Sequence, residues 1–533
     1  MKEIIYIQAG NVSNHIGTHF WNAQQSYFTY KEGEEVLIDN DVSFREGVSP
    51  RGEPTYCPRL LQFDRKANFG SLSSATGLYA VDSAGEFPPS SIWDGGVDEI
   101  YQDHISDGLY QTQLDEEIEE DVAVAPPEPQ RSTVVPPLCA SDVRYWSDYD
   151  RVYHLPRSIH KLPDLADWEA AEGDWRAGKE AFLRYDLDHS VMDDSFRLFV
   201  EECDTFQGLQ LCTDNASFGS FCNSLLTVFR DEFPKQPTLT FAVLSDAVPG
   251  DIDVDDIRGI QKALNDASCL HGLNELSTMS IPLQSPNTWL PGAWSTALTT
   301  DLRNHYDTSA ILSAHVETVT LPLRLKKNRE LLYGFCNQLN VYGNTPFAEL
   351  SGAFPASSVE VLDSTTYGFT RIQPLREDRW SPPLHRRNVT RGWTELTRRR
   401  FDDLDAVLAI SASAHSLHTQ IEYPLPSSFP SFFRAQHLNA DLLRTPRGIL
   451  TQARSTPMVS TLGSGWASPF LLTQYAEFLR DCLRRKVDWA TLGMDEDDAR
   501  ELRDDLWTMR DNFGEKHELS GDDGGGLGED EEY

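Results

Sequence analysis

The sequence predicts an α/β protein whose core is a doubly wound sheet with helices on both faces. Two observations support this fold class. A β-branched apolar run with Ile4, Ile5 and Ile7 leads through a glycine into helix-type sequence, and strand-type and helix-type segments alternate through 141–325. Such alternation is typical of parallel sheets, whose strands are joined by crossover helices. Because ligands of these sheets sit at the carboxyl ends of the strands, the loops there are the first candidates for a site.

The N-terminal segment combines a strand, a tight turn and the start of a helix. Three isoleucines in the first run suit a buried strand. Gly10 supplies the turn, and Asn11 or Ser13 can cap the helix that follows. A helix N-terminus presents free backbone N–H groups, so this junction has the geometry of a phosphate site.

Two segments resemble tubulins. The opening carries tubulin residues at Gly10, Asn14, Ile16, Gly17, Phe20 and Trp21. Residues 203–211, with the sequence CDTFQGLQL, resemble the C-D-x-x-Q-G-F-Q-L of tubulins, which a phosphate loop, G-G-G-T-G-S-G, follows at once. Of that loop only Gly219 and Ser220 remain here, and Phe218 and Phe221 place bulk where phosphates pass in tubulin.

A tubulin-like opening, a degenerate glycine loop, a long insertion and the length of the chain together resemble the Misato family of tubulin-related proteins. The resemblance is strongest over 1–30 and 195–245. It implies a tubulin/FtsZ-like fold and a role in mitochondrial distribution and mitochondrial DNA inheritance. Composition and spacing do not by themselves indicate that role.

Composition limits the classes of function. The 533 residues carry 83 acidic and 46 basic side chains, a net charge of −37, which repels nucleic acid and anionic lipid. No run approaches the roughly 18 apolar residues of a transmembrane helix. The eight cysteines form no C-x-x-C pair, which favours reduced thiols. With Glu3 in a strand and no basic presequence, we expect a cytoplasmic protein that visits the outer surface of the mitochondrion.

The chain divides into five expected regions. The tubulin-like domain comprises 1–65 and 141–325, which should share one sheet because both loops must meet at one edge. Between them, 66–140 is an acidic, Pro/Ser-rich insertion that we expect to be partly disordered. A second α+β domain with C-terminal helices follows at 326–515, and 516–533 is an acidic, disordered tail.

Individual elements follow from residue patterns. Strands are predicted at 59–63, 240–244 and 316–321. One helical stretch is predicted to end near 200, a second runs through 264–273, and two more occupy 470–483 and 496–513.

Three further patterns have two interpretations each. Nine arginines lie between 371 and 400. They could form a docking patch that binds acidic partners or lipid headgroups, or they could form ion pairs with the chain's own acidic residues. His15 and His19 are four residues apart and could begin a metal site, but surface or packing histidines are the favoured interpretation. Residues 436–442 resemble the G-Q-L-N-A-D-L loop that tubulin uses in hydrolysis, and their late position favours coincidence.

The candidate nucleotide contacts come from the two loops. They are Gly10, Asn11, Asn14, Asn215, Ser217, Gly219 and Ser220. Because the glycine cradle is rewritten, we expect a pseudo-GTPase with no catalytic residues, no metal and no required cofactor. Weak GTP binding stays open, since Asn215 and Ser217 can donate hydrogen bonds.

The resulting hypothesis is a non-enzymatic, tubulin-like protein that acts in partitioning of mitochondria and mitochondrial DNA inheritance. Its expected partners are proteins, either the tubulin-folding machinery or proteins of the mitochondrial surface, and not nucleic acid. One alternative is an active GTPase that forms or regulates filaments, and another is a tubulin-folding or spindle factor. The altered glycine loop favours the first hypothesis over an active GTPase.

Overall fold

A computed structural model gives the structure of most of the chain. The described residues are 2–28, 36–48, 54–73, 105–106, 108, 110–112, 138–164, 173–253, 255–289, 298, 300–341, 343–354, 367–368, 385–392, 413–433, 439–444, 450–465, 467–485 and 487–513.

The central element is a six-stranded sheet with the order β5-β4-β1-β6-β7-β8. All five strand pairings are parallel. The strands are β1 (Glu3–Ala9), β4 (Leu60–Arg65), β5 (Ile159–Leu162), β6 (Phe206–Asp214), β7 (Thr238–Val243) and β8 (Met279–Leu283). The predicted fold class is confirmed, and segments 1–65 and 141–325 both contribute strands to this one sheet.

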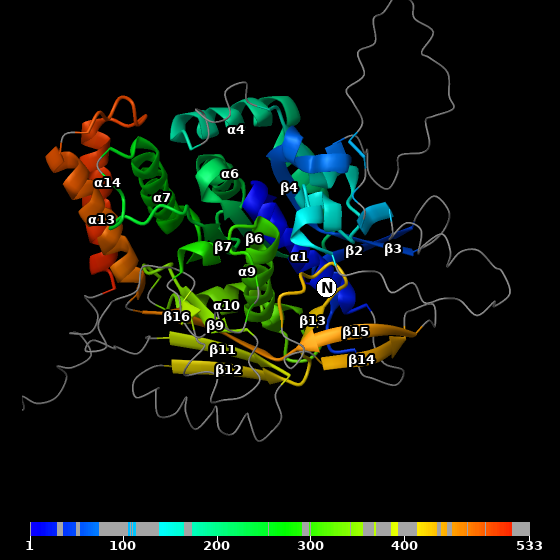
Figure 1. Ribbon diagram of the computed structural model, residues 1–533. Coiled ribbons are helices and arrows are strands. Elements are labelled where there is room, and N and C mark those ends of the chain that lie inside the picture. The colour runs from blue at the N-terminus through cyan, green and yellow to red at the C-terminus, as the bar shows by residue number, and fades with distance from the viewer. Residues whose placement is uncertain are drawn as a thin grey trace, which may run out of the picture.

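Helices cover both faces of the sheet (Figure 1). One face carries α4 (Trp175–His189), α6 (Asn215–Glu232) and α7 (Ile257–Leu276), and the other carries α1 (Asn11–Ser26), α9 (His305–Val319) and α10 (Leu332–Leu339). Strand β1 shows why two cores form. Ile5 and Ile7 belong to the first core, whereas Ile4 and Tyr6 belong to the second. Successive side chains of a strand point to opposite faces, so a strand covered on both sides is apolar throughout.

Smaller elements complete this part of the chain. Helix α4 is followed by its C-cap Ser190, whose backbone is left-handed with a φ of 44°, and a π-helical turn (Val191–Phe196) leads into α5 (Arg197–Glu201). The strands β2 (Phe44–Val48) and β3 (Pro54–Pro58) form an antiparallel pair. Short 3-10 segments occupy Asn40–Val42, Lys66–Ser73, Ala140–Asp142, Trp146–Tyr149, Pro156–Ser158, Pro286–Thr288 and Leu321–Arg324.

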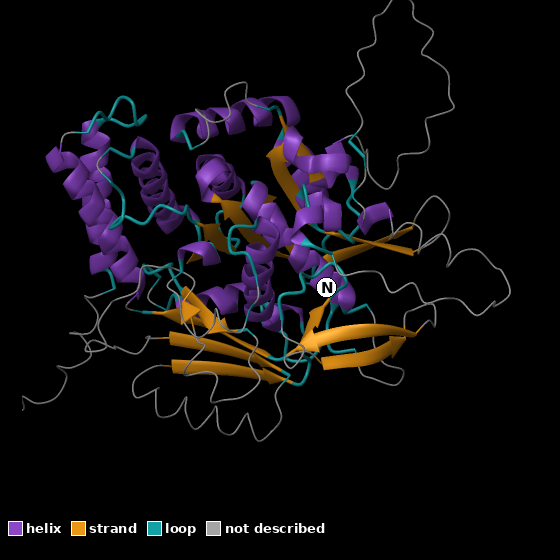
Figure 2. Ribbon diagram, viewed as in Figure 1, coloured by secondary structure: helices purple, strands orange, loops and turns teal. Residues whose placement is uncertain are grey.

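Two further sheets lie on the α9 side of the molecule (Figure 2). The larger has the order β10-β9-β16-β11-β12, and the smaller has the order β13-β15-β14. Their bounds are β9 (Glu349–Ala353), β10 (Tyr367–Gly368), β11 (His385–Arg391), β12 (Ser413–Thr419), β13 (Tyr423–Leu425), β14 (Asn439–Arg444), β15 (Leu450–Thr456) and β16 (Met458–Ser464).

The last two helices return to the opposite face. Helices α13 (Ala467–Arg485) and α14 (Glu496–Asp511) pack against each other and beside α7 (Figure 1). Their apolar side chains, Tyr475 and Leu506 among them, join the same core as α6 and α7. Both helices were predicted from their apolar spacing, and both are confirmed.

One predicted strand is wrong. Residues 316–319 end helix α9, and a 3-10 turn follows at Leu321–Arg324. Every residue from Tyr306 to Val319 is buried. Because α9 has no solvent-exposed face, its sequence lacks the periodicity that marks a helix, and its β-branched residues suggested a strand instead.

The other predicted elements agree with the structure. The strands at 59–63 and 240–244 are β4 and β7, with ends shifted by one or two residues, and the helix through 264–273 is α7. The helical stretch predicted to end near 200 corresponds to α4, the π-helical turn and α5, which ends at Glu201. Most of the insertion 66–140 and the whole tail 516–533 lie outside the described residues. Within the described residues, no helix is long and apolar enough to span a bilayer.

Candidate functional site

The two tubulin-like loops meet at the carboxyl edge of the central sheet. Strands β1 and β6 are neighbours, with Ala9 opposite Thr213. Helix α1 begins directly after Gly10, and α6 begins directly after Asp214. The N-termini of both helices therefore lie side by side, as a nucleotide site of this fold class requires.

Gly10 packs directly on the second junction. Its φ of +96° is a conformation that side chains other than glycine rarely adopt. A Cβ on Gly10 would lie 2.6 Å from the Cβ of Asp214 and 3.1 Å from both the Phe218 ring and the Ser217 hydroxyl. The two junctions are thus in van der Waals contact, with no room for a phosphate between Gly10 and the start of α6.

The Asp214 carboxylate serves the N-termini of both helices. One oxygen accepts a hydrogen bond from the Val12 amide at 3.3 Å, and the other accepts from the Ala216 amide at 3.2 Å. Only 6% of Asp214 is exposed. Burial raises the pKa of its carboxyl group, and the Val12 amide opposes that rise. A helix N-terminus favours negative charge, so this carboxylate occupies a position that suits an anion.

The two phenylalanines of the rewritten loop are core residues. Phe218 is 2% exposed and Phe221 is 1% exposed, and their ring centroids lie 5.3 Å apart. Phe221 also packs against Phe63 of β4 and Phe182 of α4. The bulk that the sequence places in this loop therefore joins the core and anchors α6 to the sheet.

Asn14 is committed to the neighbouring strand. Its amide nitrogen donates to the Phe63 carbonyl at 3.1 Å and to Asp64 Oδ2 at 3.0 Å. Asp64 also accepts from Asn68 and from the Trp146 indole, at 2.8 and 3.1 Å. Burial raises the pKa of Asp64 to about 6, against these hydrogen bonds. Asn11, the first residue of α1, is half-buried.

Gly219 has a structural role that its sequence context does not reveal. A Cβ on Gly219 would lie 1.8 Å from Asn215 Oδ1, because the Asn215 amide folds over the glycine. That amide donates to Asp266 Oδ1. Ser220, one residue further on, donates to the Trp175 carbonyl at 2.5 Å. The retained Gly219–Ser220 pair thus supports contacts within the protein.

Asp266 joins α7 to α6, α13 and the loop after β7, and it was not among the sequence candidates. Besides Asn215, it accepts from the Ser245 amide at 3.1 Å, the Ser245 hydroxyl at 2.7 Å and the Tyr475 hydroxyl of α13 at 3.1 Å. Burial raises its pKa to about 6, and the Ser245 hydrogen bonds oppose that rise. No local pattern marks this residue, since its partners lie far away in the sequence.

His15 and His19 are packed inside the protein. His15 Nδ1 lies 2.8 Å from the Tyr149 hydroxyl, and His19 Nε2 lies 2.9 Å from the Tyr306 carbonyl. Burial holds the pKa of His15 well below its usual value and lowers that of His19 to about 3. No group of three metal-ligating side chains occurs in the described part of the chain.

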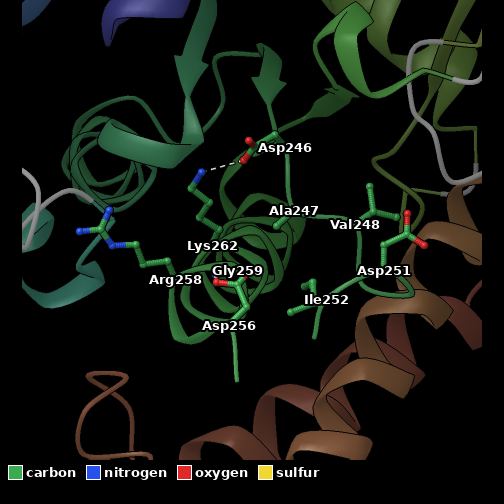
Figure 3. Close-up of a pocket in the computed structure, with 9 residues that line it drawn as sticks. All are labelled: Asp246, Ala247, Val248, Asp251, Ile252, Asp256, Arg258, Gly259 and Lys262. Carbon is green, nitrogen blue, oxygen red and sulfur yellow. Dashed lines mark hydrogen bonds and ion pairs between the residues drawn. The ribbon is translucent and has the colours of Figure 1, made fainter. Parts of the chain in front are cut away.

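A surface cleft of about 290 Å³ lies where β7 leads into α7 (Figure 3). Three of its polar side chains are engaged within the protein. The Lys262 ammonium lies 2.7 Å from Asp246, and Asp256 accepts from the Gly259 amide at 2.9 Å as the N-cap of α7. The cleft thus offers a ligand few polar groups that are not already engaged.

The arginine-rich segment 371–400 is described only at 385–392. Arg387 pairs with Glu330 and Arg391 with Glu317, and both arginines are buried. These two therefore pair with the chain's own acids and do not form a docking patch. Of the hydrolysis-like run at 436–442, residues 436–438 lie outside the described residues, and 439–442 belong to β14.

Comparison with known proteins gives the family. A model of the Misato Segment II tubulin-like domain matches residues 2–116, and a model of the tubulin domain matches residues 135–325. Protein dml1 of Aspergillus clavatus is 30% identical over 473 residues, which cover 83% of this chain and 88% of that protein. Protein DML1 of Gibberella zeae is 36% identical over 360 residues, 66% of this chain and 67% of that protein. Protein misato of Drosophila melanogaster is 29% identical over 366 residues, 63% of this chain and 62% of that protein. The chain therefore belongs to the Misato/DML1 family of tubulin-like proteins.

Proposed function

We propose that this protein is a pseudo-GTPase of tubulin shape that acts through protein partners in the partitioning of mitochondria and the inheritance of mitochondrial DNA. The family resemblance supplies the cellular role. One observation carries the non-enzymatic part, namely that Asp214 and Phe218 contact Gly10 where a nucleotide phosphate would have to pass.

The chemistry of phosphoryl transfer explains why this contact matters. Catalysis of that reaction depends almost entirely on positioning the phosphates and stabilising their charge. Here the Val12 and Ala216 amides already donate to a carboxylate, and a second negative charge beside it would be repelled. The contact at Gly10 and the engagement of these two amides therefore support the absence of phosphoryl transfer.

We further propose that the protein works in the cytoplasm and at the outer surface of the mitochondrion. A net charge of −37 opposes adsorption to anionic lipid, which favours docking through a protein partner. Arg387 and Arg391 are engaged internally, so this docking does not use them.

The biochemical test is GTP turnover by the purified chain over a range of protein concentrations. We expect phosphate release at the level of buffer alone. Release that rises with protein concentration and disappears in Asn14→Ala would contradict the proposal, and would favour the alternative of a filament-forming GTPase.

The cellular test is depletion combined with protease treatment of intact mitochondria. We expect uneven mitochondrial DNA in daughter cells, and digestion of the mitochondrion-associated protein by added protease. Normal inheritance after full depletion, together with co-purification of the tubulin-folding machinery, would instead favour a tubulin-folding factor. Protection from protease would contradict the outer-surface location.

A further inference from the structure

The N-termini of α1 and α6 share one anionic side chain. Residue Gly10 precedes α1 and has no side chain to cap it, and the first turn of α1 contains no acid. The first turn of α6 also contains no acid. Both helices instead meet the Asp214 carboxylate, through the Val12 amide and the Ala216 amide. Two helix N-termini that converge on one negative charge are the arrangement that proteins use to hold a phosphate.

We propose that Asp214 is a built-in anion that replaces a nucleotide phosphate at this site and holds the two junctions together in the absence of any ligand. This inference rests on the proposed function, because it presumes that no nucleotide occupies the site.

The packing around the carboxylate supports this role. The Ser13 hydroxyl donates to the Cys212 carbonyl at 2.7 Å, which ties the first turn of α1 to the end of β6. Gly10 contacts Asp214 with no gap between them. Asp214 itself is nearly fully buried. The two junctions are therefore closed on each other, with the anion supplied by the chain.

Asp214 differs from the ordinary helix caps of this protein. Asp256 caps only α7, where it accepts from the Gly259 amide, and Asp174 caps only α4, where it accepts from the Arg176 and Ala177 amides. The second oxygen of Asp214 accepts a hydrogen bond from the Val12 amide of α1, which lies 202 residues earlier in the sequence. Its charge thus links two distant segments, whereas the other caps act locally.

The consequence concerns regulation. A tubulin-like fold whose phosphate position is filled by its own side chain stays in the occupied arrangement whatever the nucleotide concentration. Partner binding by this protein should therefore be indifferent to GTP and GDP, because neither ligand can distinguish two states of the site.

Substitution of Asp214 by glycine tests the role of the charge, because glycine removes the carboxylate, leaves its volume free for a small anion and is still an acceptable N-cap. Thermal unfolding of the full chain is measured in phosphate buffer and in chloride of equal ionic strength. Phosphate stabilises folded proteins in general, so the shift of the wild-type midpoint between the two salts sets the baseline. We expect Asp214→Gly to melt lower in chloride and to gain about 2 °C or more beyond that baseline in inorganic phosphate, which would fill the vacated anion position.

The matched controls are Asp256→Gly, which alters a single-helix cap, and Asp214→Glu, which keeps the charge. The phosphate shift of both should equal that of the wild-type chain. If Asp214→Gly does not fold in chloride, the variant and the wild-type chain are refolded from denaturant with and without phosphate. A gain in phosphate beyond that of the wild-type chain supports the proposal, and a gain no larger than that of the wild-type chain overturns it.

The proposal and the proposed function can fail separately. Stabilisation of the wild-type chain by GTP, or turnover of GTP, would contradict the pseudo-GTPase assignment whatever Asp214→Gly does. An Asp214→Gly chain that gains no more from phosphate than the wild-type chain would overturn the role of Asp214 and leave the absence of hydrolysis intact.

Discussion

Arg391 of β11 and Glu317 of α9 form an ion pair in which neither side chain is exposed to solvent. Arg324 approaches the same carboxylate at 3.0 Å and is equally buried. The Tyr27 hydroxyl, just beyond α1, donates to Glu317 at 3.0 Å and accepts from Arg391 at 2.7 Å. One carboxylate thus joins α9, beneath the central sheet, to the larger of the two outer sheets.

Replacement of Glu317 by glutamine should strongly destabilise the protein. The change leaves two buried arginines without a counter-charge, and breaking a buried pair in this way costs about 3–5 kcal/mol. Unfolding in denaturant measures the loss. Glu180→Gln, which removes the exposed partner of Arg184 on α4, should cost less than about 1 kcal/mol. Equal losses in the two variants would contradict the expectation.

Gly219→Ala should lower stability by about 1–3 kcal/mol, because the new Cβ displaces the Asn215 amide from its contact with Asp266. Gly334→Ala is the matched control. Its Cβ would meet nothing within 4 Å, and alanine is the better helix former, so stability should rise by about 0.5–1 kcal/mol.

A double variant separates this steric role of Gly219 from any role in ligand binding. In an Asn215→Ala background, the Gly219→Ala change should cost less than it does in the wild-type chain, because the clashing amide is gone. A cost that is unchanged in that background would show that Asn215 is not the reason for the glycine.

Stability should fall as the pH falls below about 6.5. Burial lowers the pKa of four histidines in the folded chain: His15, His19 to about 3, His160 to about 4 and His315 to about 3. The unfolded chain therefore binds protons first, and each histidine removes about 2 kcal/mol by pH 5.

Two buried aspartates oppose this trend. Asp64 and Asp266 have folded-state pKa values of about 6, above the ordinary 3.8, so the folded chain binds these protons first as the pH falls. Each restores about 1 kcal/mol at pH 5, which is less than the histidines remove. Thermal midpoints between pH 7.5 and pH 5 measure the net effect. His160→Asn should flatten the slope, and a midpoint that is constant over this range would refute the assignment.

One cysteine per chain should react rapidly with a thiol reagent. Cys139 is exposed, Cys203 is half-buried, and the other six are buried. Burial raises the pKa of Cys212, Cys222 and Cys336 to about 12, which suppresses the reactive thiolate. A colorimetric disulfide reagent at pH 7.5 counts the fast thiols. Cys139→Ser should abolish the fast phase and Cys222→Ser should leave it unchanged. A fast phase that survives Cys139→Ser would contradict the expectation.

Local sequence was enough to predict the elements that have clear borders or one apolar face. The junction at Gly10 was recognisable because a β-branched run, a glycine and a helix cap follow one another directly. Helices α13 and α14 were recognisable because water covers one side of each. Helix α9 was not, since it is buried all round and its sequence carries no helical period.

The sequence indicated where the candidate site lies, but not which side chains hold its two junctions together. Gly10 and Gly219 were identified from the family pattern, whereas Asp214 and Asp266 were missed. Their roles depend on partners that are distant in sequence, with Asp214 and Val12 separated by 202 positions and Asp266 and Asn215 by 51. The residues next to an aspartate in the sequence do not indicate which distant amide will donate a hydrogen bond to its second carboxylate oxygen.

The middle position of β1 sets an order of events during synthesis. One neighbour, β4, emerges soon after it, but the other, β6, ends at Asp214. At 5–20 residues per second, the ribosome needs roughly 10–40 s to make the chain between β1 and the end of β6. Through that interval a strand of isoleucine and tyrosine shows one unpaired edge, which invites association with other nascent chains. The growing polypeptide should therefore depend on a chaperone from its first strand until its sixth is made.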